Sequence, residues 1–85
     1  MYEIIVHDTT YDEIANNGRN FIIQRACSDL KVGDDVIFRE IEWGYVGDYT
    51  GRSITASVTF IQQNSTYLQN GYSVIGFDVK EVHRG

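Results

Sequence analysis

Apolar and polar residues alternate along three long stretches of the chain, and a period of two is typical of strands with one buried face. The clearest case is residues 52–62, where every second residue from Ile54 to Phe60 is apolar. Two shorter stretches are rich in β-branched residues and suit short strands. The pattern predicts five strands, at residues 2–7, 21–25, 35–43, 52–62 and 71–82.

The segment between the first two predicted strands has the spacing of three and four residues that is typical of a helix, and it indicates one short helix. Thr10 and Glu13 have the spacing of a capping box, in which each side chain accepts a backbone N–H of the other residue. Gly18 can end the helix in a left-handed conformation. The apolar residues of this segment share one helical face: Tyr11, Ile14 and Ala15. We expect a helix of about two turns that packs on a sheet.

These elements predict a β-rich α+β fold, a partly closed five-stranded barrel with one short N-terminal helix that leaves few strand edges exposed. The 85 residues fit one domain, residues 1–85, with a thin core and a shallow or edge-lying site. Gly76 inside the last strand predicts a bulge or a close backbone approach. Cys27, the single cysteine, cannot form an internal disulfide and is expected to be a buried or idle thiol.

The net charge of the chain and its lack of a long apolar run exclude several classes of function. The chain has 12 acidic and 7 basic residues, a formal charge of -5, so we expect no general binding of duplex DNA. No apolar run approaches the roughly 18 residues of a membrane span, and the acidic, polar start is unlike a signal peptide. We therefore expect a cytoplasmic protein without membrane contact. Five acidic residues are expected to form a solvated face around the third strand: Asp34, Asp35, Glu40, Glu42 and Asp48.

The order of motifs along nearly the whole chain resembles the PUA-like superfamily, and within it the ASCH group and a similar family of small phage and prophage proteins of unassigned function. The motifs follow the first strand and helix: Gly18, Arg25, Val32-Gly33-Asp34, Phe38-Arg39-Glu40, Tyr49-Thr50-Gly51-Arg52 and Gly71-Tyr72-Ser73-Val74-Ile75. The resemblance implies a pseudo-barrel with a cleft beside the first helix, where many members bind RNA, nucleosides or modified bases.

The ASCH signature, Gly-x-Lys-x-x-Glu-x-Arg, is only half present. Gly18 and Arg25 match it, whereas Asn20 stands at the lysine position and Ile23 at the glutamate position. Related acetylcytidine amidohydrolases place a catalytic lysine and a threonine at those two positions. Neither an amide nor an isoleucine side chain can serve as acid, base or nucleophile near neutral pH. We therefore expect no enzyme activity, and a diverged cytidine hydrolase ranks last among the hypotheses.

Arginines and tyrosines are the candidate ligand-binding residues. Arg25, at a strand end, can hold a phosphate, a carboxylate or a base edge with paired donors, or instead form an ion pair with Glu40 or Asp34. Arg52 follows Tyr49, whose ring can stack on a base or pack over its own hairpin. Trp43, Tyr45 and Tyr49 also form a possible exposed aromatic patch.

Two further residues complete the predicted ligand site. His7 lies at the end of the first strand beside the helix start, where it either contacts a ligand or is structural. Asn20 occupies the signature's lysine position in the same cleft. One cysteine and two distant histidines do not make a metal site, and no cofactor is expected.

Two functions from different classes follow from these observations. The first is a non-catalytic PUA-like domain that binds RNA, a nucleotide or a modified base near Arg25, assisted by Arg52 and Tyr49. The second is a phage-encoded protein that binds and inhibits or redirects a host protein through an acidic, tyrosine-bearing surface. The surface potential distinguishes the two: a positive cleft favours the first function, and a filled cleft with a broad negative face favours the second.

Overall fold

The computed structural model describes residues 2–25, 29–42, 48–63 and 71–84. Within these residues it contains five strands and one helix, as the hydrophobic pattern predicts. Their order along the chain is β1 (Tyr2–Val6), α1 (Asp8–Asn16), β2 (Phe21–Arg25), β3 (Asp35–Ile41), β4 (Tyr49–Gln63) and β5 (Tyr72–Arg84). Three residues discussed above, Cys27, Trp43 and Tyr45, lie outside the described residues.

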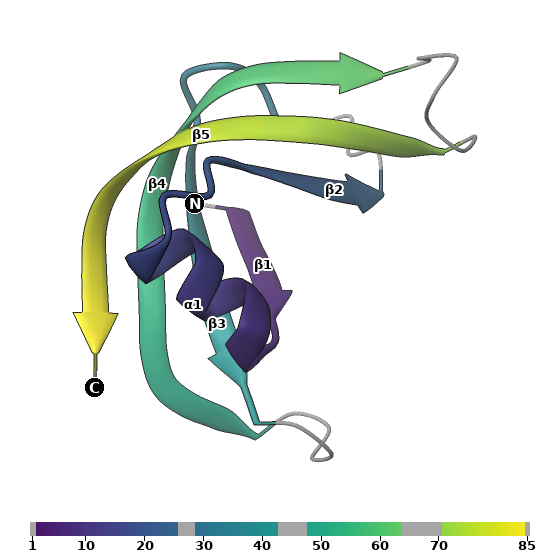
Figure 1. Cartoon of the computed structure of the whole chain (residues 1–85). Helices are drawn as coiled ribbons and strands as arrows, with labels where there is room; N and C mark the ends of the chain where they lie inside the picture. The colour runs from purple at the N-terminus through teal and green to yellow at the C-terminus, as the bar shows by residue number, and fades with distance from the viewer. Residues whose placement is uncertain (1, 26–28, 43–47, 64–70, 85) are drawn as a thin grey trace.

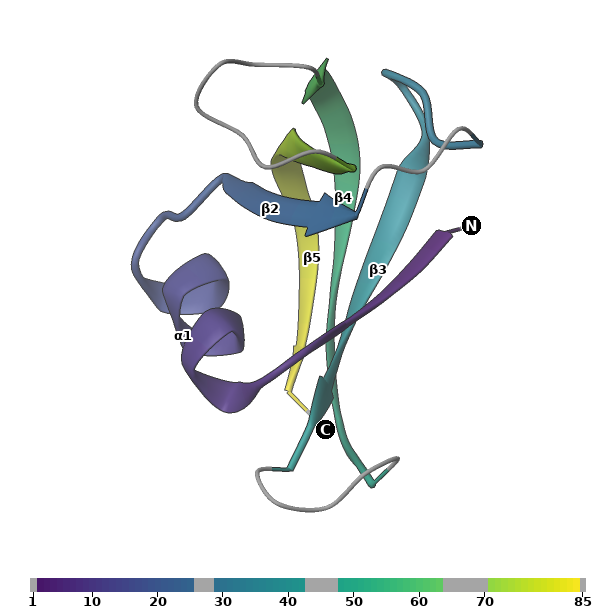
Figure 2. The same ribbon diagram turned by 90° about the vertical axis from the view of Figure 1, so that its right-hand side faces the viewer.

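The five strands form one mixed sheet in the order β1-β3-β4-β5-β2. β1 is parallel to β3, and the other neighbouring pairs are antiparallel. The long strands β4 and β5 bend, so the sheet curls into a half-barrel (Figure 1). β1 and β2 are its two edge strands, and α1 lies beside them on the concave side (Figure 2). The fold is therefore a β-rich α+β fold.

The core lies between α1 and the concave face of the sheet, because the alternating residues of each strand point there. Tyr11 and Ile14 of α1 are buried, which agrees with their predicted shared face. The strands contribute the rest of the buried apolar set, joined by Leu30: Ile4, Val6, Ile22, Val36, Phe38, Ile54, Ala56, Val58, Ile75 and Phe77. The helix is nine residues long, and no described helix has the length and apolar character needed to cross a membrane.

The start of α1 differs from the prediction. The helix begins at Asp8, and His7, not Thr10, occupies the N-cap position without a side-chain cap bond. The first helical bond joins Tyr11 N–H to the His7 carbonyl over 2.9 Å, while Asp8 Oδ1 accepts the Thr9 N–H. An acidic side chain at the positive end of the helix thus takes the place of the expected capping box.

The end of α1 agrees with the prediction. Gly18 has a φ of 74°, and Arg19 N–H donates to the Glu13 carbonyl over 3.0 Å. This bond satisfies a carbonyl of the last helical turn, and the left-handed Gly18 turns the chain away from the helix axis. The chain then turns into β2, where the Asn20 carbonyl accepts the Phe77 N–H of β5.

The long hairpin β4–β5 contains two register shifts, one between Thr55 and Ala56 and one between Val58 and Phe60. The second shift changes the face of the sheet: Val58 points into the core, whereas Phe60 lies opposite Gly76 and is exposed. A Cβ added to Gly76 would lie 2.0 Å from the Phe60 ring. The close approach predicted at Gly76 is therefore confirmed, and a side chain makes it.

Candidate functional site

An acidic residue occupies a core position of β3. Val36, Phe38 and Glu40 alternate along the strand and are all buried, as the predicted strand face requires, and the Glu40 side chain is only 1% exposed. A carboxylate removed from water in this way is costly unless it is paired and hydrogen-bonded. The prediction that Glu40 belongs to a solvated acidic face is therefore wrong, because the pleat of β3 turns its side chain inward.

Arg52 of β4 supplies the missing charge. Its Nε donates to Glu40 Oε1 over 2.6 Å, and its Nη2 donates to Oε2 over 2.5 Å. The two residues meet because Arg39 of β3 lies opposite Ser53 of β4 in the antiparallel register. Two parallel N–H···O bonds fix the guanidinium in plane with the carboxylate. Thr50 adds a third bond, from Oγ1 to Glu40 Oε1 over 2.7 Å, and its Oγ1 accepts the Arg52 N–H.

The helix holds the other side of this ion pair. The Arg52 guanidinium carbon lies 4.5 Å from the centroid of the Tyr11 ring, a cation–π distance. Tyr11 is fully buried, and its hydroxyl donates to the His83 carbonyl over 3.0 Å. The guanidinium is therefore positioned by Glu40 of β3 and by Tyr11 of α1. Tyr11 in turn links it to the end of β5.

The electrostatics of the pair follow from this geometry. Burial alone raises the pKa of Glu40, but the hydrogen bonds from Arg52 and Thr50 and the charge of Arg52 outweigh it, so the pKa is lowered. The hydrogen bond to Glu40 likewise raises the pKa of Arg52. Glu40 is therefore an anion held in place, which makes it a weak proton acceptor and an unsuitable general acid.

A polar hollow of about 700 Å³ opens beside the pair. The Arg52 side chain is 34% exposed there, so the ion pair forms part of a surface that a ligand can reach. The lining residues come from α1, β3, the residue after β3, and β4: Asp8, Glu40, Ile41, Glu42, Tyr49, Thr50 and Arg52. We call this hollow the Glu40–Arg52 pocket. Its three carboxylates and one guanidinium give it a net negative charge.

Tyr49 forms an exposed aromatic wall of the pocket. Its ring is half exposed, and its hydroxyl donates to Glu3 Oε1 over 3.3 Å. Arg39, which forms an ion pair with Glu3 over 2.6 Å, places its guanidinium carbon 5.9 Å from the Tyr49 ring centroid. These contacts orient the ring without covering it.

A second hollow, of about 600 Å³, lies at the other end of β3, among Tyr2, Asp29, Leu30, Asp34 and Asp35. Its acidic residues already serve the local structure, since Asp34 Oδ2 accepts the Lys31 N–H and Asp35 forms an ion pair with Lys80. The carboxylates of both contacts are on exposed side chains, whereas the Glu40–Arg52 pocket contains an ion pair whose carboxylate is buried. The latter is the better candidate site.

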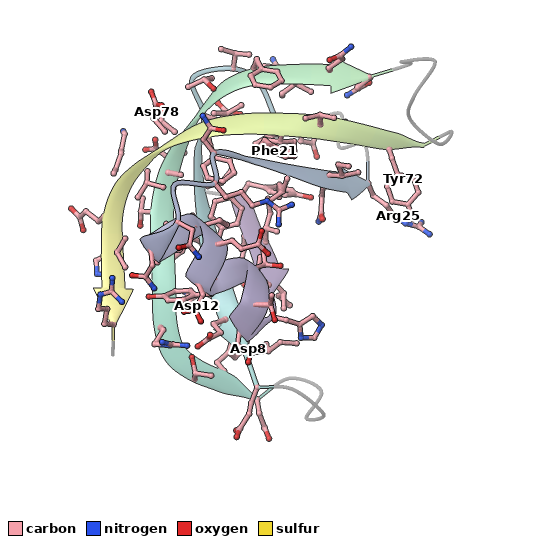
Figure 3. The ribbon with its side chains drawn as sticks, viewed as in Figure 1. Asp8, Asp12, Phe21, Arg25, Tyr72 and Asp78 are labelled. Atoms are coloured by element: carbon pink, nitrogen blue, oxygen red, sulfur yellow. The ribbon has the colours of Figure 1, made fainter. Side chains whose placement is uncertain are left out.

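The structure brings two of the five predicted ligand residues together. Arg52 and Tyr49 share the pocket, but Arg25 lies opposite Tyr72 in the β2–β5 register, at the other end of β5 from Arg52, which lies opposite Arg84. Figure 3 shows Arg25 and Tyr72 together at this far end, away from Asp8 and Asp12 of α1. Among the described residues, no ion pair joins Arg25 to Glu40 or Asp34.

His7 and Asn20 lie elsewhere. His7 lines a small cavity of about 160 Å³ between β1, β2 and α1, which also includes Arg19 and Ile23. The Asn20 side chain is exposed, and only its backbone carbonyl has a described role, in the bond to Phe77. The predicted ligand residues thus do not form one site.

Sequence reasoning did not assign the other lining residues of the pocket to a ligand site, nor Tyr11, which packs on Arg52. These lining residues are Asp8, Glu40, Ile41, Glu42 and Thr50. A signal for Glu40 was present, since an acid at an alternating core position of a strand requires a buried partner. The partner itself depends on the strand register, which the sequence does not display.

The chain matches, over residues 1–77, the model of a family described as a domain of unknown function, DUF3850. The match covers most of the 85 residues, so the chain belongs to this family. A search among curated proteins finds no match to this chain.

Proposed function

We propose that this protein is a non-catalytic, PUA-like binding domain that holds a nucleobase-bearing ligand, such as RNA, a nucleotide or a modified base, in the Glu40–Arg52 pocket. The observation that supports the proposal is the buried, bidentate Glu40–Arg52 pair beside the half-exposed Tyr49 ring. A base needs a stacking surface and fixed polar groups at its edge, and this pocket offers both.

The polar groups of the pocket match the mixed edge of a base. Glu40 engages Nε and Nη2 of Arg52, which leaves the donors on Nη1 available to a ligand acceptor. Glu42 and Asp8 are exposed acceptors for ring N–H or amino groups. The pocket is negative, whereas a positive cleft was expected for this function. The pocket therefore favours the base itself, and a phosphate of RNA or of a nucleotide must lie outside it, away from the three carboxylates. Tyr49 supplies the stacking face.

The same contacts support binding without catalysis. The lowered pKa of Glu40 keeps its carboxylate ionised and engaged by three hydrogen bonds, so it has little tendency to take up or release a proton. Asn20 and Ile23, at the signature's catalytic positions, offer no proton-transfer group.

The proposal is tested by titrating nucleosides, modified nucleosides and their monophosphates into ¹⁵N-labelled protein and following the amide resonances. We expect shifts at the backbone amides of residues 40–42 and 49–52, with tighter binding of a nucleoside than of its monophosphate. Tyr49→Ala removes the stacking ring from an exposed position and is expected to weaken binding at least about fivefold.

Val32→Ala is the matched control, since it shortens another exposed apolar side chain, in the turn before β3. Its affinity should equal that of the unchanged chain. Absence of shifts with every nucleoside, or equal affinity of the Tyr49→Ala and Val32→Ala variants, would contradict the proposal.

A second candidate is binding to a basic region of a host protein. The observation that favours it is the set of exposed acidic residues around the half-exposed Tyr49: Glu3, Asp8, Glu42 and Asp48. Such a surface complements a positively charged partner. It becomes the better proposal if no nucleobase ligand shifts the pocket resonances.

A further inference from the structure

A second surface, on the convex side of the sheet, carries aromatic residues that the Glu40–Arg52 pocket does not use. The register fixes which residues share it: Phe21 and Phe60 both lie opposite Gly76, Ile23 and Gln62 lie opposite Val74, and Arg25 lies opposite Tyr72. Directly opposite residues point to the same face of a sheet. We call this surface the aromatic face; its residues are Phe21, Ile23, Arg25, Phe60, Gln62, Tyr72, Val74 and Gly76.

Burial confirms that this is the outer face. The alternate residues Ile22, Ser73 and Ile75 are buried, whereas Phe21, Ile23 and Phe60 are exposed by 43%, 55% and 46%. The bulge between Val58 and Phe60 places the Phe60 ring outside the core, and the missing side chain of Gly76 gives it room above the backbone of β5. The backbones of Phe21 and Phe60 are therefore two strand spacings apart, about 10 Å, and the Phe60 ring lies over the central strand between them.

The charge of the aromatic face is opposite to that of the whole chain. Arg25 is exposed on it, and among the described residues no carboxylate forms an ion pair with Arg25, unlike Arg39 and Arg52. Arg19 places its guanidinium carbon 5.2 Å from the Phe21 ring centroid while also contacting Glu13. Asp78, the next outward residue of β5 after Gly76, borders the face at one end.

We propose that the aromatic face binds single-stranded nucleic acid, with bases stacked on Phe60 and Phe21 and a phosphate held by Arg25. Exposed rings on one face of a sheet offer stacking surfaces to unpaired bases, and an arginine at the end of the rows supplies the charge that a phosphate needs. A duplex hides its base faces and offers only phosphates, for which one or two arginines in a chain of charge -5 are too few. This face is separate from the Glu40–Arg52 pocket.

The experiment measures fluorescence anisotropy of labelled oligouridylate and oligothymidylate, about eight nucleotides long, with a duplex of equal length for comparison. We expect both single strands to bind more tightly than the duplex, because stacking and phosphate contacts do not depend on the sugar. With one or two phosphate contacts, affinity should fall only about three- to sevenfold between about 50 and 200 mM salt.

Three variants locate the binding surface. Phe60→Leu keeps an apolar cover over Gly76 but removes the stacking ring, and it should weaken binding at least about fivefold. Arg25→Gln should weaken binding and reduce the slope of log affinity against log salt by about 0.7. Lys31→Gln removes one positive charge from the exposed turn before β3 and is the matched control, with affinity within about twofold of the unchanged chain. Circular dichroism verifies that each variant is folded.

Four outcomes would overturn the inference. The first is no binding of either single strand, and the second is duplex binding as tight as single-strand binding. The third is a loss that Tyr49→Ala causes and Phe60→Leu does not, which would place the strand in the Glu40–Arg52 pocket and support the proposed function instead. The fourth is a concentration-dependent dimer that Phe60→Leu dissociates, which would assign the aromatic face to a second copy of the chain.

Discussion

At the scale of single residues, Glu40 shows how one polar group can organise a site. Its strand position buries it, and burial without compensation would cost several kcal/mol. Arg52 and Thr50 together donate three hydrogen bonds to the carboxylate, and Tyr11 packs against the guanidinium. Because these partners come from β4 and α1, the ion pair becomes rigid only when the sheet and helix are assembled.

The lowered pKa of Glu40 predicts how stability depends on pH. Folding makes Glu40 easier to ionise, so its contribution to stability is complete above the unfolded pKa of about 4.3 and is lost as pH falls through the lower folded pKa. Chemical denaturation from about pH 7 to about pH 3 should therefore show a falling free energy of unfolding, less steep in Glu40→Gln. At neutral pH we expect Glu40→Gln to be less stable by about 2 kcal/mol.

Glu42→Gln serves as the control, because it removes an exposed carboxylate from the same pocket. If Glu40→Gln and Glu42→Gln give the same acid slope, the buried pair is not the origin of the effect.

At the scale of elements, the register shift between Val58 and Phe60 determines which side chains of β4 point into the core and which point outward. Before the shift the even-numbered residues Ile54, Ala56 and Val58 face the core, and after it Phe60 faces outward and Ile61 packs against the core. Gly76 makes this possible, because a side chain there would collide with the Phe60 ring. The outward position of the Phe60 ring thus requires both the register shift in β4 and the glycine at position 76.

This dependence predicts a measurable coupling between the two positions. Gly76→Ala forces the Phe60 ring from its place and should lower the free energy of unfolding by about 1–2 kcal/mol. In a Phe60→Ala background the ring is absent, so the same change should cost at least about 0.5 kcal/mol less. A double-mutant cycle from urea denaturation measures the difference, and additive effects would show that the contact does not constrain Gly76.

At the scale of the whole molecule, β1 and β2 are the edge strands of the half-barrel, and within the described residues no further strand lies on their outer sides. The chain contains no proline that could block these edges, and Ile5 and Ile23 on them are more than half exposed. Free, apolar strand edges favour pairing with another chain. The same open architecture exposes the Glu40–Arg52 pocket and the aromatic face on different sides of one sheet.

Ile5→Glu is therefore expected to slow aggregation of the protein. Ile5 lies opposite Arg39 in the β1–β3 register, so a new carboxylate meets an opposite charge and the free energy of unfolding should change by less than about 0.5 kcal/mol. Light scattering at elevated temperature measures the aggregation rate. Val32→Glu adds the same charge in an exposed turn, and an equal effect of both variants would attribute the change to net charge and not to the edge.

Much of the fold was predictable because its signals are local. Alternation in β3, β4 and β5 follows from the pleat, and the left-handed Gly18 follows from its missing side chain. Boundaries were less accurate: β4 begins at Tyr49, three residues before the predicted start, because the strand continues along its partner β3 as far as the Ile41–Tyr49 pair. The cap of α1 was misassigned because Asp8 and Thr10 both fit a helix start by sequence.

The sequence by itself determined the acidic balance and, for the part of the chain that the structure describes, the five strands and the short helix, since each depends on residue type or on short spacing. The tertiary structure decided which charges meet. Arg25 and Arg52 are alike in sequence, yet the register pairs Arg52 with Glu40 and leaves Arg25 at the far end of β5. Contacts of this kind depend on which strands are neighbours, and strand order is a property of the folded chain alone.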